Sequence, residues 1–321
     1  MLASPAIERC LRADWRADAV ETVAQWWPGW LAISAAHVSP IERAIAGGFA
    51  ADRVAWAFAC GYQAALRALV PDLPADALAA FCVTEEAGNR PRDIQTTITH
   101  GADDSVSLTG AKRWTTLGPD SSLLLVVGRE VNAADGDGSD RLRLRVARVP
   151  SGAPGLSLVA MPATRFVPEV PHARVQLDHV RLPASALLPG DGYAAFVKPF
   201  RTIEDTHVTA AVLAYLLREA RARSWPTDLR ERLAATLAAL VAVATGRADS
   251  PATHIVLEGA LRWAHQLYSE AGPLWAAAAD EAGARWQRDA ALFAVAGTAR
   301  AQRATRAWER LSQPQQGDWN E

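Results

Sequence analysis

The chain has 321 residues, of which half are hydrophobic and 21% are charged, and its formal net charge at pH 7 is −2. This length allows two or more domains, and the composition is typical of a globular protein rather than a disordered one. The basic residues form no stripe that would attract a polyanion, so we expect no nucleic-acid partner.

Two features of the sequence indicate a cytoplasmic protein. In the first residues, MLASPAIERCLRAD, Glu8 and Arg9 interrupt the apolar run, so neither a signal peptide nor a membrane span is expected there. Cys10, Cys60 and Cys82 are few and lie among apolar residues, which is typical of buried free thiols in a reducing compartment. We therefore predict a cytoplasmic protein without a membrane segment.

The first third of the chain has a helical pattern. It is rich in Ala, Leu and Trp, and its turn signals include Pro28-Gly29 and Gly47-Gly48. Within ADRVAWAFACGYQAALRAL the apolar residues recur at helical spacing. They are Val54, Phe58, Tyr62, Ala65 and Leu69. We predict an N-terminal helical domain over residues 1–80.

At residue 81 the hydrophobic period changes to that of β-strands. Leu144 and Val146 alternate with arginines, and the segment HARVQLDHVRLP at 172–183 alternates in the same way. Clusters of Gly and Pro such as PSGAPG separate these runs, as in an antiparallel sheet or barrel. We predict a middle β domain of this type over residues 81–192.

After residue 192 the helical period returns. One helix is expected after Pro226, which suits a first helical turn, and further helices are expected over residues 255–267 and 286–311. A C-terminal helical bundle is therefore predicted over residues 193–314, followed by a polar tail at 315–321. The predicted fold class is α+β, with helices on either side of a β domain in the sequence.

Four motifs that occur in this order resemble the acyl-CoA dehydrogenase family. They are CVTE at 82–85, LTGAKRWTT at 108–116, VQLDHVRLPASALLPGDGYAAF at 175–196 and RTIEDTHVTAAVLA at 201–214. The resemblance covers nearly the whole chain and implies the fold of that family. It also implies an FAD cofactor, an acyl thioester substrate carried by CoA or an acyl carrier protein, a role in fatty acid metabolism, and a homo-oligomer.

The resemblance assigns four residues to the flavin. Val83 and Thr84 match a strand end whose backbone amides and hydroxyl meet the polar edge of the isoalloxazine ring. Trp114 and Thr116 match an aromatic residue beside the flavin and a hydroxyl near its N5 and O4 atoms. Taken alone, Trp114 and Thr116 would fit a core aromatic and an ordinary strand residue, but the CVTE motif upstream favours a flavin site.

Two segments depart from the pattern of the family. The run of small residues that usually follows the Thr-Glu pair is one residue shorter here, and it keeps small residues only at Ala87 and Gly88. The family's Gln followed by paired glycines, which helps to hold the pyrophosphate and adenosine of FAD, is not found here. The segment QLYSEAGPLW at 266–275 stands roughly in its place, with one glycine.

The general base of the family is a carboxylate, and the matching positions of this chain carry none. Ala296 or Gly297 stands at the usual position, and Thr206 stands at the position that other members use. Three residues around Thr206 could accept a proton instead. They are Glu204, Asp205 and His207. We predict that one of these three is the catalytic base.

Several readings of the function stay open. Glu204 and Asp205 also fit a structural role, as acidic residues in a first helical turn. Loss of a positioned base slows catalysis by roughly two to four orders of magnitude. The sequence thus favours an FAD-dependent oxidoreductase that performs α,β-dehydrogenation of an acyl substrate. The alternatives are a flavin-dependent oxygenase or oxidase on the same fold, and a catalytically degenerate homologue that acts as a binding or assembly partner.

No metal site is expected, because the seven histidines are spread along the sequence without the spacing of metal ligands.

Overall fold

The computed structural model describes residues 4–131, 143–295 and 297–312, so Ala296 and the predicted polar tail at 315–321 lie outside the described residues. The contacts divide the chain into two compact units. The helical unit contains Met1–Ala19, His37–Ala65 and Thr202–Glu321, and the β unit contains Val20–Ala36 and Leu66–Arg201. The division into domains at residues 1–80, 81–192 and 193–314 stays a prediction.

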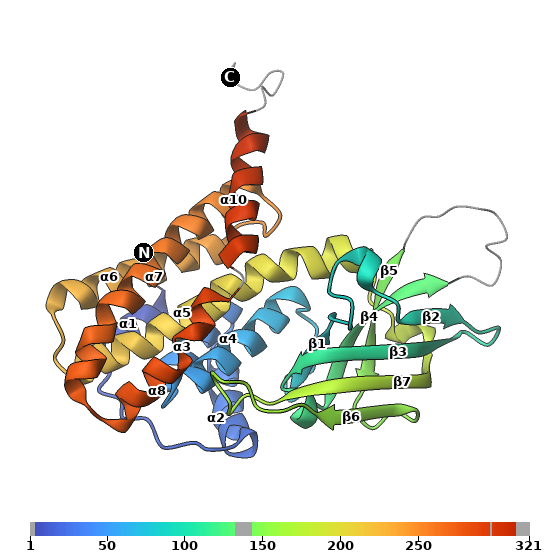
Figure 1. Cartoon of the computed structure of the whole chain (residues 1–321), viewed down its shortest axis with the longest axis horizontal. Coiled ribbons are helices and arrows are strands. Elements are labelled where there is room, and N and C mark those ends of the chain that lie inside the picture. Colours follow the sequence, from blue (N-terminus) through green and yellow to red (C-terminus); the bar gives the residue numbers. More distant parts are fainter. Residues whose placement is uncertain (1–3, 132–142, 296, 313–321) are drawn as a thin grey trace. The chain divides into compact units, whose positions relative to one another are not determined.

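The helical unit is built from helices that are distant in the sequence (Figure 1). They are α1 (Pro5–Arg12), α3 (Pro40–Ala50), most of α4 (Val54–Leu69) and α5 (Lys198–Ala222), α6 (Thr227–Thr245), α7 (Pro251–Ala278), α8 (Glu281–Asp289), α9 (Ala291–Ala294) and α10 (Gly297–Ser312). On α6, Leu229, Leu233, Leu237 and Leu240 are all buried, as their helical spacing predicts.

The single helix predicted over residues 286–311 is wrong. The chain there forms the end of α8, the short helix α9 and the separate helix α10. The break falls at Val295, whose backbone is extended (φ −60°, ψ 138°). A β-branched residue followed by Ala-Gly favours such an interruption, because helix propensity is low at valine and lowest at glycine among residues other than proline.

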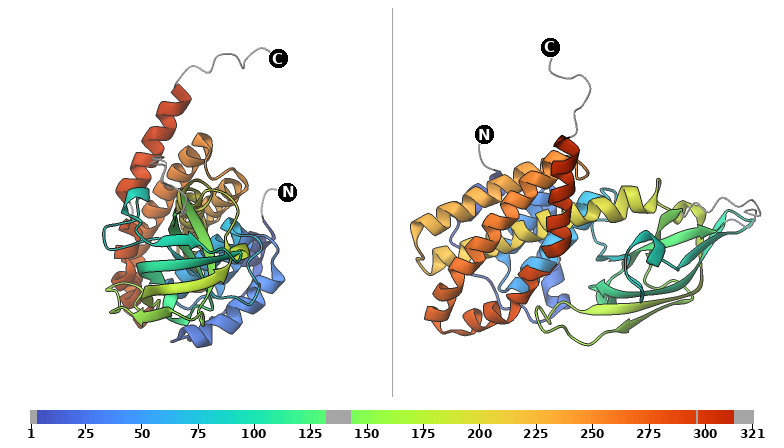
Figure 2. Two further views of the ribbon diagram at one scale, coloured as in Figure 1. Left: turned by 90° about the vertical axis from the view of Figure 1, so that its right-hand side faces the viewer. Right: turned by 45° about the horizontal axis from the view of Figure 1, so that its top comes forward.

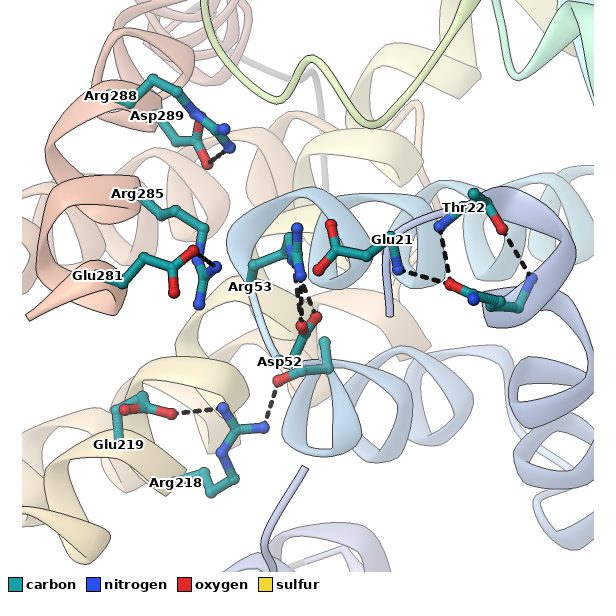
Figure 3. Close-up of polar contacts among 12 residues, drawn as sticks. Glu21, Thr22, Asp52, Arg53, Arg218, Glu219, Glu281, Arg285, Arg288 and Asp289 are labelled. Atoms are coloured by element: carbon teal, nitrogen blue, oxygen red, sulfur yellow. Dashed lines mark hydrogen bonds and ion pairs between the residues drawn. The ribbon is translucent and has the colours of Figure 1, made fainter. Parts of the chain in front are cut away.

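Arginines of α5 hold the N-terminal helices of the helical unit. Arg218 donates to the carbonyl oxygen of Phe49 at 3.0 Å, and it pairs with Glu219 at 2.5 Å (Figure 3). Arg221 donates to the carbonyl oxygen of Cys10 at 2.6 Å. Because these carbonyls lie at helix ends, the guanidinium groups satisfy acceptors that the helices themselves leave unpaired. Elsewhere in this unit, α10 packs against α7 (Figure 2).

The β unit contains α2 (Val23–Ala36) and one seven-stranded sheet with the strand order β1-β4-β2-β3-β7-β6, in which β5 also pairs with β4. The strands are β1 (Ala79–Cys82), β2 (Thr97–His100), β3 (Ser105–Thr116), β4 (Leu123–Val131), β5 (Leu144–Pro150), β6 (Leu156–Ala160) and β7 (His172–Pro183). The short helices are η1 (Pro91–Asp93), η2 (Gly118–Asp120), η3 (Ala184–Ala186) and η4 (Gly192–Val197).

The α+β fold class is confirmed, but the sheet is mixed rather than antiparallel. Strand β4 pairs in parallel with both β1 and β2, while the remaining pairings are antiparallel. Alternating residues of β3 and β7 point into one core, and the alternation is interrupted where the register of the two strands shifts. Val106 and Leu108 lie there with Val175 and Leu177.

The three cysteines are free and buried, which confirms that prediction. Among the described residues, no helix has the combination of length and apolar character that crossing a membrane requires.

Candidate active site at the end of strand β1

At the end of β1, one of the two backbone hydrogen-bonding groups of Thr84 is paired and the other is not. The backbone N–H of Arg113 on β3 donates to the carbonyl oxygen of Thr84 at 2.9 Å. The N–H of Thr84 itself has no acceptor among the residues that the structure describes, although Thr84 is half-buried. A backbone donor without a protein partner binds water or a ligand. The Thr84 N–H is therefore available to an external acceptor.

The segment after β1 forms a tight turn. Glu85 and Gly88 exchange two backbone hydrogen bonds, of 2.8 and 3.2 Å, across Glu86 and Ala87. Gly88 has φ +138°, and a Cβ atom there would meet the Oδ2 atom of Asp93 at 2.6 Å, so glycine is required. The shortened run of small residues is thus an ordered turn directly beside the strand end.

A buried ion pair lies beneath this turn. The ammonium of Lys112 on β3 is 2.6 Å from Oε1 of Glu85, and the two residues are 1% and 7% exposed. The Glu85 carboxylate also accepts from the N–H of Gln95 (2.7 Å), the N–H of Thr96 (3.0 Å) and the hydroxyl of Thr96 (2.7 Å). Burial raises the pKa of Glu85, but Lys112 and the hydrogen bonds from Thr96 outweigh it and keep the pKa below its ordinary value.

Trp114 stands on a β-bulge and faces solvent. The register of β3 against β7 shifts between Lys112 and Thr115, and within this bulge Trp114 has φ +58°. A positive φ is a strained conformation for a bulky residue, and such strain clusters at functional sites. The side chain is nevertheless 46% exposed. A strained backbone that carries an exposed indole indicates that the Trp114 side chain is available to contact a ligand.

Trp114 is surrounded by a guanidinium group, an imidazole ring and a thioether sulfur. The guanidinium of Arg113 lies 5.5 Å from the ring centroid, and the ring of His172 meets the indole edge-on at 6.0 Å. The sulfur of Met161 accepts a hydrogen bond from the backbone N–H of Trp114 at 3.4 Å. Thr116, half-buried at the end of β3, pairs with His172 in the sheet register.

The three candidate bases lie on α5 in the helical unit. Asp205 binds two guanidinium groups of α10, those of Arg300 (2.7 Å) and Arg303 (2.8 Å). His207 is buried, and burial lowers its pKa to about 4, although the contact of its Nδ1 atom with the Ile203 carbonyl (2.7 Å) opposes this shift. Such an imidazole is neutral at pH 7.

The structure also places the third candidate base, Glu204, and the positions at which the family carries its carboxylate. The hydroxyl of Thr206 is buried and donates to the carbonyl oxygen of Thr202 at 2.8 Å, so it is occupied within its own helix. Glu204 is half-buried on the same helix. Gly297 begins α10, and a Cβ atom built on it would have no described atom within 4 Å. Ala296 lies outside the described residues.

Comparison with known proteins shows the fold. No family model matches the sequence, and no curated protein matches it. Solved structures do match. One is FkbI, for biosynthesis of the methoxymalonyl extender unit of a polyketide, with 22% identity, a TM-score of 0.58 and coverage of 86% of this chain and 84% of FkbI. Another is butyryl-CoA dehydrogenase from Megasphaera elsdenii, with 16% identity, a TM-score of 0.63 and coverage of 84% and 81%. A third is PigA in complex with FAD, with 13% identity, a TM-score of 0.67 and coverage of 90% of each chain. The chain has an acyl-CoA dehydrogenase-like fold.

In this acyl-CoA dehydrogenase-like chain, the predicted site residues form two groups. Val83, Thr84, Trp114 and Thr116 all belong to the β unit, where β1 and β3 bring them together. Glu204, Asp205 and His207 belong to the helical unit.

The pair of Glu85 and Lys112 was not predicted from the sequence. A signal was present, because Val106, Leu108 and Lys112 share the inward-facing period of one strand. A lysine at an inward position of a sheet requires a buried partner. The nearest acid that precedes it in the matching motifs is Glu85 in CVTE.

Proposed function

We propose that this chain is an FAD-dependent, acyl-CoA dehydrogenase-like oxidoreductase that removes hydrogen from the α and β carbons of an acyl thioester or a related acyl substrate. The observation that carries the proposal is the strand end of the β unit, where an unpaired Thr84 N–H and the strained, half-exposed indole of Trp114 occur in this fold. Two of the matching structures support it, since one is a complex with FAD and another is named for an acyl-CoA substrate.

The residues of the β unit fit the flavin ring of FAD. The Thr84 N–H is an unused donor for the polar edge of the ring, and Trp114 offers an exposed flat face beside it. Thr116 supplies a half-buried hydroxyl, and the Val83 carbonyl faces the Lys112 ammonium rather than a ligand. When bound, FAD would accept the hydride equivalent that leaves the substrate.

The proton that leaves the α-carbon needs an acceptor from this chain. Glu204, Asp205 and His207 remain the proposed set. Asp205 is already bound by two guanidinium groups, and the Nδ1 atom of His207 contacts a carbonyl within its helix. Each member of the set is tested by its own substitution.

The same proposal extends to partners and setting. We propose that the substrate is carried by CoA or an acyl carrier protein, that the chain forms a homo-oligomer, and that it acts in cytoplasmic fatty acid metabolism. The resemblance to the family supports the carrier, the homo-oligomer and the role in fatty acid metabolism, and the N-terminal residues and the cysteines support the cytoplasmic setting.

The visible absorption spectrum tests the proposal. We expect flavin bands in the purified protein, or after incubation with FAD at micromolar concentration, and anaerobic bleaching of these bands by an acyl thioester. Absence of flavin bands together with absence of uptake would reject a flavoenzyme. Substrates with CoA and with acyl-carrier-protein thioesters, compared at equal concentration, separate the two carriers.

A second function is favoured by the residues at the usual base positions. Thr206 and Gly297 cannot accept the α-proton, and Asp205 is held by two arginines. A flavin-dependent oxygenase or oxidase needs no such base. It would show flavin uptake and a requirement for an external flavin reductase, without bleaching by an acyl thioester. A degenerate homologue that acts as a binding or assembly partner would show neither uptake nor bleaching.

A further inference from the structure

The ion pair of Lys112 and Glu85 is unusual because it is buried in the interior of the β unit. Lys112 is one of only two lysines in the sequence, and its side chain is fully shielded from solvent. Removing two charges from water costs several kcal/mol per ion, and replacing such a pair by apolar residues is often neutral or even stabilising. Stability alone therefore does not account for the pair.

Glu85 fixes the position of the ammonium. Its carboxylate receives hydrogen bonds from Gln95 and Thr96, which directly precede β2, and from Lys112 on β3. Its own backbone is fixed by the turn that it forms with Gly88. With so many constraints on one carboxylate, the ammonium has little freedom to move.

Lys112 also contacts the peptide group that carries the unpaired donor. Its Nζ atom lies 3.5 Å from the carbonyl oxygen of Val83. This carbonyl and the N–H of Thr84 belong to the same peptide unit, which is planar and conjugated. A positive charge at the oxygen draws electron density from the nitrogen, and in a site of low dielectric this polarisation makes the N–H a stronger donor.

We infer that Lys112 is a positioning and polarising residue for the proposed flavin site, which acts through the Val83–Thr84 peptide to strengthen the hydrogen bond that the Thr84 N–H donates to the flavin, and that Glu85 holds Lys112 in place. This inference rests on the proposed function. Donors at the polar edge of a flavin stabilise its reduced form more than its oxidised form, because reduction adds electron density there. Lys112 thus favours the reduced flavin.

The reduction potential of the bound flavin tests this inference. The main variant combines Lys112→Met with Glu85→Gln, so that no unpaired charge remains buried. We expect the ratio of reduced to oxidised flavin, at a fixed potential of a reference dye, to fall about tenfold. This corresponds to a shift of about −30 mV for a two-electron couple. Urea unfolding of the apoprotein, measured in parallel, reports any purely structural effect.

A second buried ion pair of the β unit provides the matched control. Glu130 on β4 is 4% exposed at its side chain and pairs with Arg145 at 3.1 Å. Glu130→Gln should lower the stability of the apoprotein and leave the flavin potential unchanged. If Glu130→Gln shifts the potential as much as the double variant does, the shift reflects a general loss of packing rather than a specific effect of Lys112, and the inference is overturned.

The remaining outcomes separate the inference from the proposed function. A wild-type protein that takes up FAD, with an unchanged potential in the double variant, overturns the inference alone. A wild-type protein that takes up no FAD overturns both. If the double variant does not fold or takes up no FAD, Glu85→Asp replaces it, because this change keeps both charges and draws Lys112 away from Val83. A fall of about threefold in the ratio is then expected, and no fall rejects the inference.

Discussion

Arg300 on α10 donates two hydrogen bonds, of 2.9 and 2.7 Å, to a single carboxylate oxygen of Asp205 on α5. Arg303, one turn further along α10, binds the other oxygen at 2.8 Å. A carboxylate that serves two guanidinium groups in this way links two helices that are distant in the sequence. It is also one of the three residues that the sequence offers as a base.

Substitution Asp205→Asn should weaken the attachment of α10. All three side chains are less than one fifth exposed, so the change leaves two partly buried guanidinium groups without their counter-charge. We expect the free energy of unfolding in urea to fall by about 2 kcal/mol. The control is Asp249→Asn, which removes an exposed pair with Arg247 and should cost less than about 0.5 kcal/mol. Equal losses in the two variants would contradict a structural role of Asp205.

The candidate base Glu204 is tested by Glu204→Gln. If its carboxylate takes the α-proton, anaerobic bleaching of the flavin by an acyl thioester should slow by roughly two to four orders of magnitude. FAD uptake and the urea midpoint of the apoprotein should stay close to those of the wild type, because Gln preserves the shape of the side chain. Unchanged bleaching would remove Glu204 from the set and direct the same test to Asp205 and His207.

His207 should make the stability depend on pH. Burial lowers its pKa from 6.5 to about 4 in the folded protein. Between these values the unfolded chain binds a proton that the folded chain does not, so the stability contribution is complete above pH 6.5 and falls as the pH decreases towards 4. We expect a loss of about 2 kcal/mol by pH 5, from the shift that separates the two states.

The measurement for His207 compares wild type with His207→Gln. Urea unfolding at pH 7.5 and at pH 5 gives the difference between the two proteins at each pH, and this comparison cancels the other titrating groups. The difference should change by about 2 kcal/mol in favour of the variant at the lower pH. A difference that is the same at both pH values would show that His207 is not shielded as the structure describes.

Gly61 allows α4 to approach the part of α5 that carries the candidate bases. A Cβ atom on Gly61 would lie 2.5 Å from the Cα atom of Val208. We therefore expect Gly61→Ala to lower the free energy of unfolding by about 1–3 kcal/mol, despite the better helix propensity of alanine. Gly259→Ala on α7 is the matched control, since its Cβ atom would meet no atom within 4 Å. It should raise stability by up to about 1 kcal/mol, and a loss there comparable with that of Gly61→Ala would refute the contact.

Trp114 should contribute to flavin binding and little to folding. Replacement by glycine removes an exposed indole and relieves the strain of φ +58°, so the stability of the apoprotein should change by less than about 1 kcal/mol. FAD uptake should weaken at least tenfold, because the flat face beside the flavin is lost. The control is Trp263→Ala, which removes an indole of the helical unit that is 57% exposed and should not affect uptake. Loss of uptake in both variants would argue against a specific role of Trp114.

The fold and part of the site could be predicted from the sequence, for identifiable physical reasons. The inward-facing period of β7 and the leucine face of α6 follow from burial on one side of an element, which leaves a repeating mark. The parallel pairing of β4 with β1 and β2 leaves no such mark, because it depends on long-range topology. Trp114 could be placed by its motif, but its positive φ depends on a bulge opposite β7 that no local pattern reveals.

Because Lys112 is shielded, the chain presents a single lysine side chain to solvent, that of Lys198 at the start of α5. An amine-acylating reagent should label Lys198 rapidly in the native protein, whereas Lys112 can react only when the β unit opens around the turn at Glu85. Mass spectrometry of these two positions would therefore time the opening of the strand end, with Lys198 as the internal reference in every sample.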